Sequence, residues 1–489
     1  MSTNSEWVLG PQGPLRLTPY PLLGRTALRA LEAQATSGLP AHTLMQRAGL
    51  ALAQLTLAYA PHARTVWVAC GRGNNGGDGL EAAMHLQRWG KNVWLSLPES
   101  AQPLPADATA SLHRAQAAGV AIHPTPPIHW DVCIDALLGI GLRAAPQGAA
   151  LTTIQAMQAS GGNIIAADVP SGLVADTGHT PGACVRARAT LSFLALKPGL
   201  FTAQGRDVCG DIWLDTLEST ILQPPDAWLN TTKQYNPRQH ASHKGSFGDV
   251  AVVGGAAGMV GAALLAGTAA LQGGAGRVYL ALLDAGNHNA VFATHPALMQ
   301  GSLEQLAIDG MAVVAGCGGG NAIAACLPRL LAGARQLVLD ADALNALAQN
   351  PAWHPMLAAR TAGTTALTPH PLEAARLLGC STAEVQADRL ASAQALADRF
   401  QCTVALKGSG TIIASPGAVP RINPTGNARL ATAGTGDVLA GLLGSQMAQG
   451  HTGFEAACNT CYWHGQAADQ WPATSTLTAP RLADQIQAK

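Results

Sequence analysis

The sequence predicts an α/β protein with two domains, each built around a largely parallel β-sheet. In both halves short apolar runs alternate with stretches of helical periodicity, and glycine-rich or polar loops follow the apolar runs. Charged residues make up only 12% of the chain and glycine reaches 54 residues, a composition typical of large buried sheets. The periodicity lapses between residues 217 and 239, so we expect domains at 1–225 and 235–489.

The charge balance excludes two classes of partner. Lysine plus arginine and aspartate plus glutamate both number 29, and the sequence pI is about 7.2. We therefore expect neither a nucleic-acid partner nor a membrane partner. Ten cysteines without framework spacing predict free thiols, and the first residues lack a signal-peptide pattern, so we expect a cytoplasmic protein.

One segment, 250–276, holds no charged residue and is long enough to cross a membrane by length alone. Glycines interrupt it, and VAVVGG predicts a buried strand that is followed by a turn and a short helix. We interpret it as a strand–loop–helix unit of a soluble domain. The CxxC pair of Cys458 and Cys461 lies in a helical pattern, which predicts two buried thiols rather than a metal or redox site.

The first half begins with a helical pattern over residues 25–59, interrupted near Pro40. An apolar strand at 66–69 leads into GRGNNGGDG, a helix continues from Leu80, and NVWLSL (92–97) predicts the next strand. This is a βαβ unit with a glycine-rich loop at the carboxyl end of its first strand, the edge where open α/β sheets hold ligands. GxGxxG spacing alone is weak evidence, but the asparagines and the aspartate make GNNGGDG specific.

The alternation continues through the rest of the first half. We predict helices near 106–118 and 151–160, and strands at 132–137, 163–168 and 189–196. The strand ends deliver seven polar side chains to one rim of the sheet: Asn74, Asn75, Asp78, Asp135, Asp168, Ser171 and Lys197. Each one alone is more often a cap or turn residue, but their convergence on one rim favours a functional site.

The second half repeats the alternation. Its predicted strands are 250–253, 277–283, 312–315, 336–340, 364–368, 402–406 and 411–414. After one of them, His370 lies in a Pro-His-Pro turn at a helix start. KGSGT (407–411) predicts a β-turn whose amides, together with Lys407, suit a phosphate. The chain contains no Walker A sequence, so a P-loop enzyme is excluded.

The stretch 423–444, NPTGNARLATAGTGDVLAGLLG, carries the most distinctive motif. Glycines at 426, 434, 436 and 441 surround Asp437 just before an apolar helical run. Amides at a helix start carry partial positive charge and suit phosphate. An acid in that position is well placed as a base beside a bound phosphate. The alternative, in which Asp437 only caps a helix, is equally compatible with this motif alone.

These motifs resemble those of a known family. At GRGNNGGDGLEAA, DALLGIGL, DVPSGLVADTG and LALKPGL the first half is similar to the epimerase domain of the NAD(P)H-hydrate repair enzymes. At HKGSFG, DADALNAL, TPHPLEAARLLG, LKGSGTII and NPTGNARLATAGTGDVLAG the second half resembles the matching dehydratase. The resemblance implies a Rossmann-like three-layer parallel sheet in the first domain and a ribokinase-like α/β fold in the second.

The resemblance also implies an activity. The family's substrates are NADH and NADPH to which water has been added at the nicotinamide ring. The epimerase interconverts the R and S hydrates, and the dehydratase consumes ADP to remove water from the S form, giving AMP and phosphate. The resemblance further implies a potassium ion in the epimerase domain and Mg²⁺ in the dehydratase domain, and we expect a homo-oligomer.

Carried over by position, the resemblance assigns catalytic roles to Asp168 in the epimerase and to Asp437 in the dehydratase. The epimerase residues that would contact the hydrate are Asn74, Asn75, Gly76, Gly77, Asp78, Gly139, Ile140, Gly141, Leu142, Arg143 and Asp168. In the dehydratase they are Ala262, Gly318, His370 and Asp437. The residues that would hold the nucleotide are Lys407, Gly408, Ser409, Gly410, Thr411 and Gly436. Potassium would be bound through oxygens of Asn75, Asp135 and Ser171.

Three segments depart from the family pattern. The loop after Gly139 reads IGLRAAPQG, where the family usually has a threonine and an Arg-Pro pair. AGCGGG (315–320) replaces GPGLG, with Cys317 in the place of proline, and His-Pro-Leu-Glu replaces His-Pro-Gly-Glu. None of these changes removes a catalytic group, but the first two alter loops that would contact substrate.

Two other functions stay open on the sequence. The GTGD motif also serves ribokinase-type small-molecule kinases, in which case the first half would be a non-catalytic binding domain. The fused first half and the HKGSFG start argue against this alternative. Domains similar to the first half also act as scaffold modules, but the presence of Asn75, Asp135 and Asp168 argues for retained chemistry.

Overall fold

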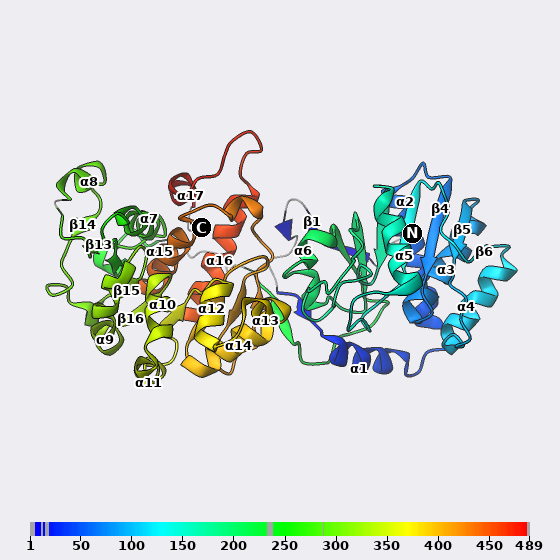
Figure 1. The fold of residues 1–489 in the computed structure, drawn as a ribbon, viewed down its shortest axis with the longest axis horizontal. Helices are drawn as coiled ribbons and strands as arrows, with labels where there is room; N and C mark the ends of the chain where they lie inside the picture. Colours follow the sequence, from blue (N-terminus) through cyan, green and yellow to red (C-terminus); the bar gives the residue numbers. More distant parts are fainter. Residues whose placement is uncertain (1–4, 11–12, 15–18, 232–237, 287, 487–489) are drawn as a thin grey trace. The chain divides into compact units, whose positions relative to one another are not determined.

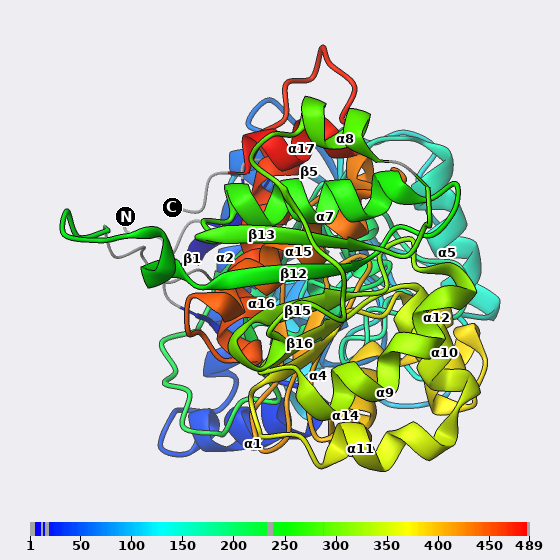
Figure 2. The same cartoon turned by 90° about the vertical axis from the view of Figure 1, so that its left-hand side faces the viewer.

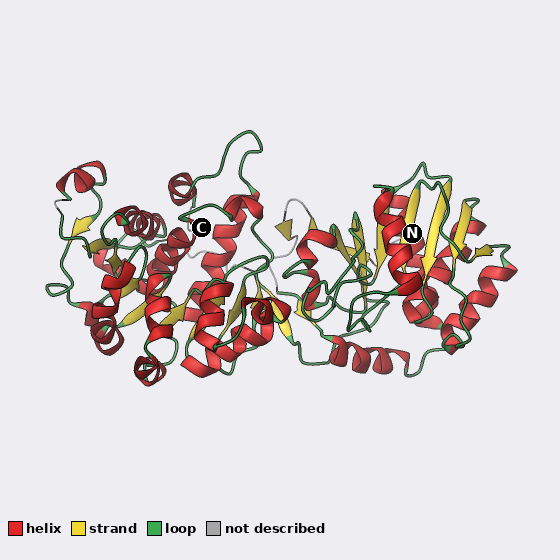
Figure 3. Cartoon of the chain, viewed as in Figure 1, coloured by secondary structure: helices red, strands yellow, loops and turns green. Residues whose placement is uncertain are grey.

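The computed structural model describes residues 5–10, 13–14, 19–231, 238–286 and 288–486. Its contacts divide the chain into two compact units, and the division falls between Trp228 and Leu229. In each unit helices cover the strands of a sheet (Figures 1 and 3), as the sequence predicted for an α/β protein.

The first unit holds a sheet with the strand order β2-β1-β10-β9-β8-β7-β4-β5-β6. These strands are β1 (Ser5–Gly10), β2 (Gly13–Pro14), β4 (Thr65–Cys70), β5 (Asn92–Ser96), β6 (Ala121–His123), β7 (Val132–Ala136), β8 (Asn163–Ala167), β9 (Ala189–Phe193) and β10 (Asp211–Asp215). The run from β10 to β6 is parallel, whereas β1 pairs antiparallel with β10. The sequence predicted the parallel centre but not β1, β2, β6 or β10, so this sheet is mixed at one edge.

The helices of the first unit include all the predicted ones. They are α1 (Arg25–Thr36), α2 (Thr43–Tyr59), α3 (Asn74–Arg88), α4 (Ala106–Ala117), α5 (Gly148–Ala159) and α6 (Gly205–Val208). Helix α3 begins earlier than predicted, and α6 was not predicted. A further strand pair, β3 (Pro21–Leu22) and β11 (Ala227–Leu229), is antiparallel. Strand β11 lies inside the segment 217–239, so the expectation that this whole segment is irregular was wrong.

Strand β4 shows why this sheet is buried on both faces. Val66, Val68 and Cys70 belong to one hydrophobic cluster, while Trp67 and Ala69 belong to another. Successive side chains of a strand point to opposite faces, so the two clusters lie on the two sides of the sheet. All five side chains are inaccessible to solvent. This double burial explains the unbroken apolar run in the sequence.

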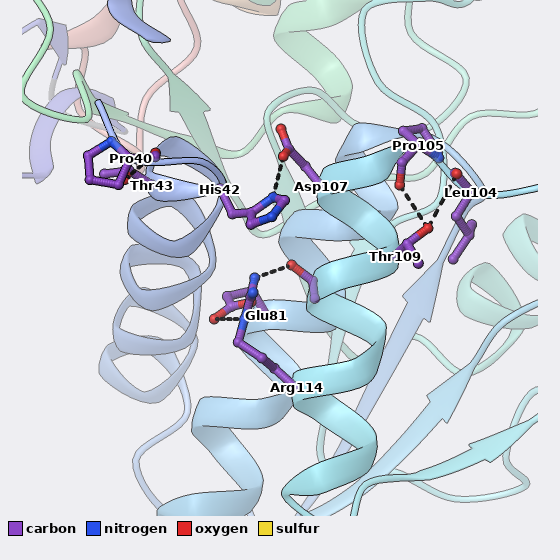
Figure 4. Close-up of polar contacts among 10 residues, drawn as sticks. Pro40, His42, Thr43, Glu81, Leu104, Pro105, Asp107, Thr109 and Arg114 are labelled. Atoms are coloured by element: carbon purple, nitrogen blue, oxygen red, sulfur yellow. Dashed lines mark hydrogen bonds and ion pairs between the residues drawn. The ribbon is translucent and has the colours of Figure 1, made fainter. Parts of the chain in front are cut away.

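Helix α3 is fixed to its neighbours by close packing and by a buried ion pair. A Cβ on Gly49 of α2 would lie 2.3 Å from the Cβ of Glu81 on α3, so only glycine allows this approach. The Glu81 side chain is 2% exposed and accepts two hydrogen bonds from Arg114 of α4 at 2.8 and 2.9 Å. A further contact joins α2 and α4: Nδ1 of His42, the residue before α2, lies 2.5 Å from Oδ1 of Asp107 in α4 (Figure 4).

The second unit holds a sheet with the strand order β14-β13-β12-β15-β16-β17-β18-β19-β20. These strands are β12 (Asp249–Gly254), β13 (Arg277–Leu282), β14 (Met299–Gln300), β15 (Ala312–Ala315), β16 (Gln336–Leu339), β17 (Thr365–Leu367), β18 (Thr403–Leu406), β19 (Ile412–Ala414) and β20 (Arg421–Ile422). The run from β14 to β18 is parallel, and β18, β19 and β20 are antiparallel to one another in turn. All seven predicted strands are present, and the short strands β14 and β20 were missed.

The helices of the second unit cover this sheet. They are α7 (Val260–Gln272), α8 (Asn289–Thr294), α9 (Ile323–Gly333), α10 (Asp342–Gln349), α11 (His354–Ala358), α12 (Pro371–Leu378), α13 (Thr382–Ala387), α14 (Arg389–Phe400), α15 (Thr435–Ala448), α16 (Gly453–Asp469) and α17 (Ala479–Gln485). Figure 2 shows α7 beside β12 and β13, with α15 near them. A Cβ on Gly441 of α15 would lie 2.0 Å from the Ala266 carbonyl oxygen, so this glycine serves helix packing rather than a ligand loop.

The charge-free segment 250–276 folds as β12 followed by α7, as predicted. Among the described residues, none of the helices combines the length and hydropathy that crossing a membrane requires. The thiols of Cys458 and Cys461 are buried in α16, and all ten cysteines are free, which confirms the predictions for both.

Candidate active sites at two sheet edges

In the first unit, the glycine-rich motif forms the start of helix α3 rather than a loop. The helix begins at Asn74, six residues earlier than predicted, so Asn74, Asn75, Gly76, Gly77 and Asp78 form its first turn. The glycines are needed for close packing: a Cβ on Gly76 would lie 1.9 Å from the carbonyl oxygen of Gly71. The sequence analysis overlooked this because glycine disfavours a helix interior, and tertiary packing overrides that preference here.

A chain of hydrogen bonds joins three of the predicted site residues. Asn75 Nδ2 donates to the Leu138 carbonyl at 3.1 Å, and the Leu138 amide donates to Ser171 Oγ at 2.8 Å. Ser171 donates to Asp135 through its amide (2.7 Å) and through its hydroxyl (2.6 Å). Asn75 Oδ1 is buried and has no hydrogen-bond partner among the described residues. A buried oxygen left without a donor is a candidate ligand for a cation.

The oxygens of this cluster suit a hard cation. Asp135 is inaccessible to solvent, and burial raises its pKa to about 6 although hydrogen bonds from Ser171 act in the opposite direction. A nearby cation would favour the ionised carboxylate. Carbonyl, carboxylate and amide oxygens without nitrogen or sulfur are the donor set of alkali and alkaline-earth ions.

Asp168 follows strand β8 in a left-handed backbone conformation, with φ of 65°. Such a conformation is strained for a residue with a side chain and is concentrated at functional sites. The Lys197 ammonium, 1% exposed, forms an ion pair with Asp168 Oδ1 and also donates to Phe193 O at 2.8 Å. The Phe193 amide donates to the same Asp168 oxygen at 3.1 Å. Asp168 is therefore oriented from two sides.

Two further acids lie in the field of Asp168. Burial raises the pKa of Asp78 well above its usual range, and the charges of Asp168 and Glu32 add to this effect. Burial also raises the pKa of Glu32 on helix α1, with Asp168 the next cause. Burial and these charges thus favour the protonated form of the Asp78 carboxyl. The sequence analysis missed Glu32, which stands in an ordinary amphipathic helix without any motif.

The predicted contact loop 139–143 follows β7. A Cβ on Gly139 would lie 3.1 Å from the Cβ of Asn75, so this glycine lets the loop pass close to the start of α3. Ile140 and Leu142 are half-buried, while Gly141 and Arg143 are exposed. The exposed pair forms the outer part of this rim.

In the second unit, Asp340 and Lys407 form the centre of the strand-end cluster. Asp340 follows β16 and is 1% exposed; it accepts from Lys407 Nζ at 2.5 Å and from Thr368 Oγ1 at 2.7 Å. Burial by itself would lower the pKa of Lys407, but the charges of Asp340 and Glu373 outweigh it and raise that pKa. The sequence analysis noted the DADALNAL strand end but did not assign Asp340 to the site.

Asp437 lies beside this pair, in the first turn of α15. Helix α15 starts after Gly434, which has φ of 89°, a conformation that favours glycine. Burial raises the pKa of Asp437 to about 6, and the charge of Asp340 adds to the rise. A Cβ on Gly436 would lie 3.4 Å from Lys407 Nζ and 4.0 Å from Asp340 Oδ2. Gly436 therefore faces the same cluster.

The predicted phosphate turn, KGSGT, is the hairpin connection between β18 and β19. Gly408, with φ of 137°, and Ser409 are exposed, while Thr411 Oγ1 donates to Gly408 O at 3.3 Å. Beneath the turn, the Arg389 guanidinium is 1% exposed and donates to the carbonyls of Leu406 and Lys407, both at 3.1 Å. A buried cation thus supports the turn in which anions would be bound.

His370 caps helix α12, as its position at a helix start predicted. Its Nδ1 accepts from the amides of Leu372 (3.1 Å) and Glu373 (3.3 Å), and its Nε2 lies 3.2 Å from Glu373 Oε1. Burial lowers the pKa of His370, and the charge of Lys407 adds to this, so the ring is neutral at pH 7. Its side chain is nevertheless 47% exposed, so one face of the ring is open to a ligand.

The remaining predicted contacts, Ala262 and Gly318, are neighbours. A Cβ on Gly318 would lie 2.9 Å from that of Ala262 and 2.6 Å from the Met259 carbonyl oxygen. This glycine allows the loop after β15 to lie against the start of α7. Beside it, Cys317 Sγ and one carboxylate oxygen each of Asp340 and Asp437 lie within 4.8 Å of one another. The sequence analysis noted Cys317 only as a replacement for proline.

Two family models match this chain. The model described as YjeF-related protein N-terminus matches residues 41–199, and the model described as NAD(P)H-hydrate dehydratase matches residues 250–488. The two matched ranges lie one in each half of the chain.

Curated relatives extend the similarity across both halves. The chain is 38% identical over 464 residues to the bifunctional NAD(P)H-hydrate repair enzyme of Escherichia coli (strain K12), covering 90% of this chain and 87% of that protein. It is 34% identical to the enzyme of the same description from Coxiella burnetii, covering 91% and 93%. An ADP-dependent (S)-NAD(P)H-hydrate dehydratase from Neisseria meningitidis serogroup B is 43% identical over 258 residues, covering 52% of this chain and 86% of that protein.

Among solved structures, the ADP/ATP-dependent NAD(P)H-hydrate dehydratase of Bacillus subtilis, co-crystallised with ATP and Mg²⁺, is 29% identical to this chain. It covers 51% of this chain and 90% of its own length, with a TM-score of 0.42.

Proposed function

The chain belongs to the family of bifunctional NAD(P)H-hydrate repair enzymes, and from that membership we propose how its two units divide the work. Residues 1–225 interconvert the R and S hydrates of NADH and NADPH. Residues 235–489 dehydrate the S form at the expense of ADP, which yields AMP, phosphate and restored NADH or NADPH.

The observation that carries this proposal is that each unit gathers its own acids at the carboxyl edge of its own sheet. Asp168 is paired with a buried lysine in the first unit. In the second unit, Asp437 lies beside the pair of Asp340 and Lys407. Two unrelated reactions need two such sites, and open α/β sheets hold ligands at this edge.

Asp437 is the proposed base of the dehydration. Hydroxide is a poor leaving group, whereas phosphate is a good one. Asp437 accepts the proton of the substrate hydroxyl while that oxygen takes the terminal phosphoryl group of ADP, and AMP departs. The C–O bond then breaks with phosphate carrying its electron pair, and loss of a proton from the neighbouring carbon restores the double bond. The pKa of about 6 keeps Asp437 ionised at neutral pH yet basic enough to accept a proton.

The hairpin at 407–411 and Gly436 are proposed to hold the nucleotide. Lys407 carries positive charge, and exposed backbone at Gly408 and Ser409 is accessible to phosphate oxygens. Gly318 and His370 follow other strands of the sheet and Ala262 lies in the first turn of α7; all three are proposed to contact the hydrate. Mg²⁺ retains waters and binds largely through phosphate oxygens, so we assign it to the bound nucleotide rather than to side chains.

In the first unit, Asp168 is proposed to transfer the proton that epimerisation requires. Lys197 and the Phe193 amide fix its carboxylate. Asp78, whose raised pKa favours the protonated carboxyl, is proposed to donate a hydrogen bond to the hydrate. The rest of the first turn of α3 and the loop 139–143 are proposed to contact the same ligand.

The oxygens of Asn75, Asp135 and Ser171 fit the potassium ion proposed for this unit. The buried Oδ1 of Asn75 has no hydrogen-bond partner among the described residues and can serve as a ligand atom for the ion. A cluster with a purely structural role would not leave this oxygen unsatisfied. Bound there, K⁺ would supply positive charge next to the substrate.

Ten free cysteines agree with the proposed cytoplasmic location. The proposed homo-oligomer has no role in this chemistry.

One assay tests the whole proposal. A mixed pool of R and S NADH hydrates is incubated with the protein, and the near-ultraviolet absorbance of restored NADH is followed with ADP, with ATP and without nucleotide. We expect complete recovery with ADP, because a dehydratase alone would stall when the S form is exhausted. If recovery stops part-way, the proposed epimerase activity is contradicted. If NADH is not restored with either nucleotide, the proposed dehydratase activity is contradicted.

A further inference from the structure

The backbone around Cys317 is held on both sides, which fixes the direction of its side chain. Its carbonyl accepts from the Gly255 amide at 3.0 Å, and Cys317 itself is inaccessible to solvent. Gly316 has φ of 114° and Gly318 φ of 59°, conformations that favour glycine. A Cβ on Gly316 would lie 1.9 Å from the Asp340 carbonyl oxygen. From this backbone the Cys317 Sγ lies within 4.8 Å of one carboxylate oxygen each of Asp340 and Asp437.

We propose that the Cys317 thiol is a positioning residue for the dehydration: it donates a hydrogen bond to the Asp437 carboxylate and holds that carboxylate ready for the substrate hydroxyl. The inference rests on the proposed role of Asp437 as the base. Its geometric support is that Sγ and the carboxylate oxygens lie within 4.8 Å of one another in a site that solvent does not reach at Cys317. Proline, the usual residue of the resembled dehydratases, has no polar hydrogen to donate.

The thiol has few other roles available. Burial raises its pKa well above the usual range, and the charges of Asp340 and Asp437 raise it further, so it stays protonated at pH 7. A protonated thiol is a donor, not a nucleophile. A metal ion at the same three side chains would have to displace the Lys407 ammonium, which lies 2.5 Å from Asp340. The geometry therefore favours a hydrogen-bond donor over a metal ligand.

The hydrogen bond from the Cys317 thiol matters because burial and the charge of Asp340 oppose the ionisation of Asp437. Burial raises its pKa to about 6, followed by the charge of Asp340; the Cys317 hydrogen bond and Lys407 lower it, and Asp342 raises it. Helix α7, which packs against α15, has no charged side chain. On α16, His464 is buried, bonds the Thr435 carbonyl at 2.9 Å and has its pKa lowered to about 4, so it is neutral. Cys317 and Lys407 are thus the groups that favour the charged base.

The test compares the pH dependence of dehydration in Cys317→Ala and Cys317→Ser, using the whole protein, S-NADH hydrate and ADP. Removing the donor should move the acidic limb of kcat/KM upward by about half a pH unit, since a hydrogen bond to the charged form lowers a carboxylate pKa. That is about a twofold loss at pH 6, approaching threefold at pH 5, and little change at pH 8. The hydroxyl of Cys317→Ser should restore the wild-type limb. Cys402→Ala removes a buried thiol elsewhere in the same unit and is the matched control.

The outcomes separate this inference from the function on which it rests. If Asp437→Ala still dehydrates, Asp437 is not the base, and both fail. If Asp437→Ala is inactive but the Cys317→Ala profile superimposes on the wild type, only the Cys317 inference is overturned. A uniform loss at every pH in both Cys317 variants would show a packing role and would equally overturn it. A shift in Cys317→Ala with recovery in Cys317→Ser supports it.

Discussion

Asp168 and Ala341 occupy comparable places in the two units. Each follows a parallel strand and has a left-handed backbone, with φ of 65° and 47°. Such a conformation costs a residue with a side chain about 1–2 kcal/mol of strain energy. Ala341 lies between Asp340 and Asp342, so at both of these strand ends a strained residue is, or adjoins, an acid of the site.

Asp437 sets the expected pH dependence of dehydration. Its pKa of about 6 is raised by burial and by Asp340, and the base must be ionised to accept a proton. We expect the dehydration rate to fall as the pH drops through about 6 and to be level above it, because the protonated carboxyl cannot act as a base. Steady-state rates on S-NADH hydrate with ADP, measured from pH 5 to 8, check this. A rate that stays level down to pH 5 would contradict the assignment.

The potassium ligands predict a difference between the two activities. Replacing K⁺ in the buffer by Li⁺, or Asn75 by alanine, should slow epimerisation at least about tenfold, because the oxygen cluster then lacks its ion or one ligand. Dehydration of pure S hydrate should be unchanged, since that site has no part in the cluster. Epimerisation is followed by chromatography of the two hydrates. Equal epimerisation rates in K⁺ and Li⁺ would contradict the proposed potassium site.

At the scale of elements, helices α3 and α15 place the site residues, and both do so through glycine. Gly76 packs on Gly71, and Gly441 packs on Ala266 of α7. Neither contact leaves space for a Cβ, so the first holds the start of α3 against the end of β4 and the second holds α15 against α7. Helix α3 is also tied to α4 by the ion pair of Glu81 and Arg114 (Figure 4).

This ion pair predicts a stability effect confined to the first unit. Arg114→Met leaves the Glu81 carboxylate buried without its partner, which should cost about 3 kcal/mol of unfolding free energy. Combining it with Glu81→Leu removes the buried charge and should recover most of that loss. Calorimetry should show a lowered transition for one unit and an unchanged one for the other. An unshifted transition in Arg114→Met would mean that the pair contributes nothing.

At the scale of the whole molecule, the proposed function gives each unit its own site, and the S hydrate passes from the epimerase to the dehydratase. The residues proposed for each activity all come from one unit, so the two activities should be separable.

A mixing experiment tests that independence. Asp168→Ala alone should restore NADH only from the S part of a mixed hydrate pool, and Asp437→Ala alone should restore none. The two variants combined should recover the whole pool with ADP, because each supplies the activity that the other lacks. Recovery that stops at the S fraction in the mixture would show that the two sites must reside on one chain.

Much of each site was predictable from local pattern. Strand ends and glycine-rich helix starts placed Asn75, Asp135, Ser171 and Asp168 on one rim, and the structure brings the first three into one hydrogen-bonded chain. The predicted start of α3 was wrong because a run of glycines is typical of a loop. In the structure these glycines lie in the helix, where they allow close packing. Strand β1 was missed because its pairing with β10 joins segments about two hundred residues apart.

The sequence by itself determined the class of fold, the division into two units, the central strands and the identity of the acids at their ends. Periodicity and turn chemistry are local, so they are legible along the chain. Only the tertiary structure decided which side chains meet: Lys197 with Asp168, Glu81 with Arg114, and the Cys317 thiol with Asp437. These contacts join residues far apart in the chain, and their burial and pKa values depend on packing that no local pattern records.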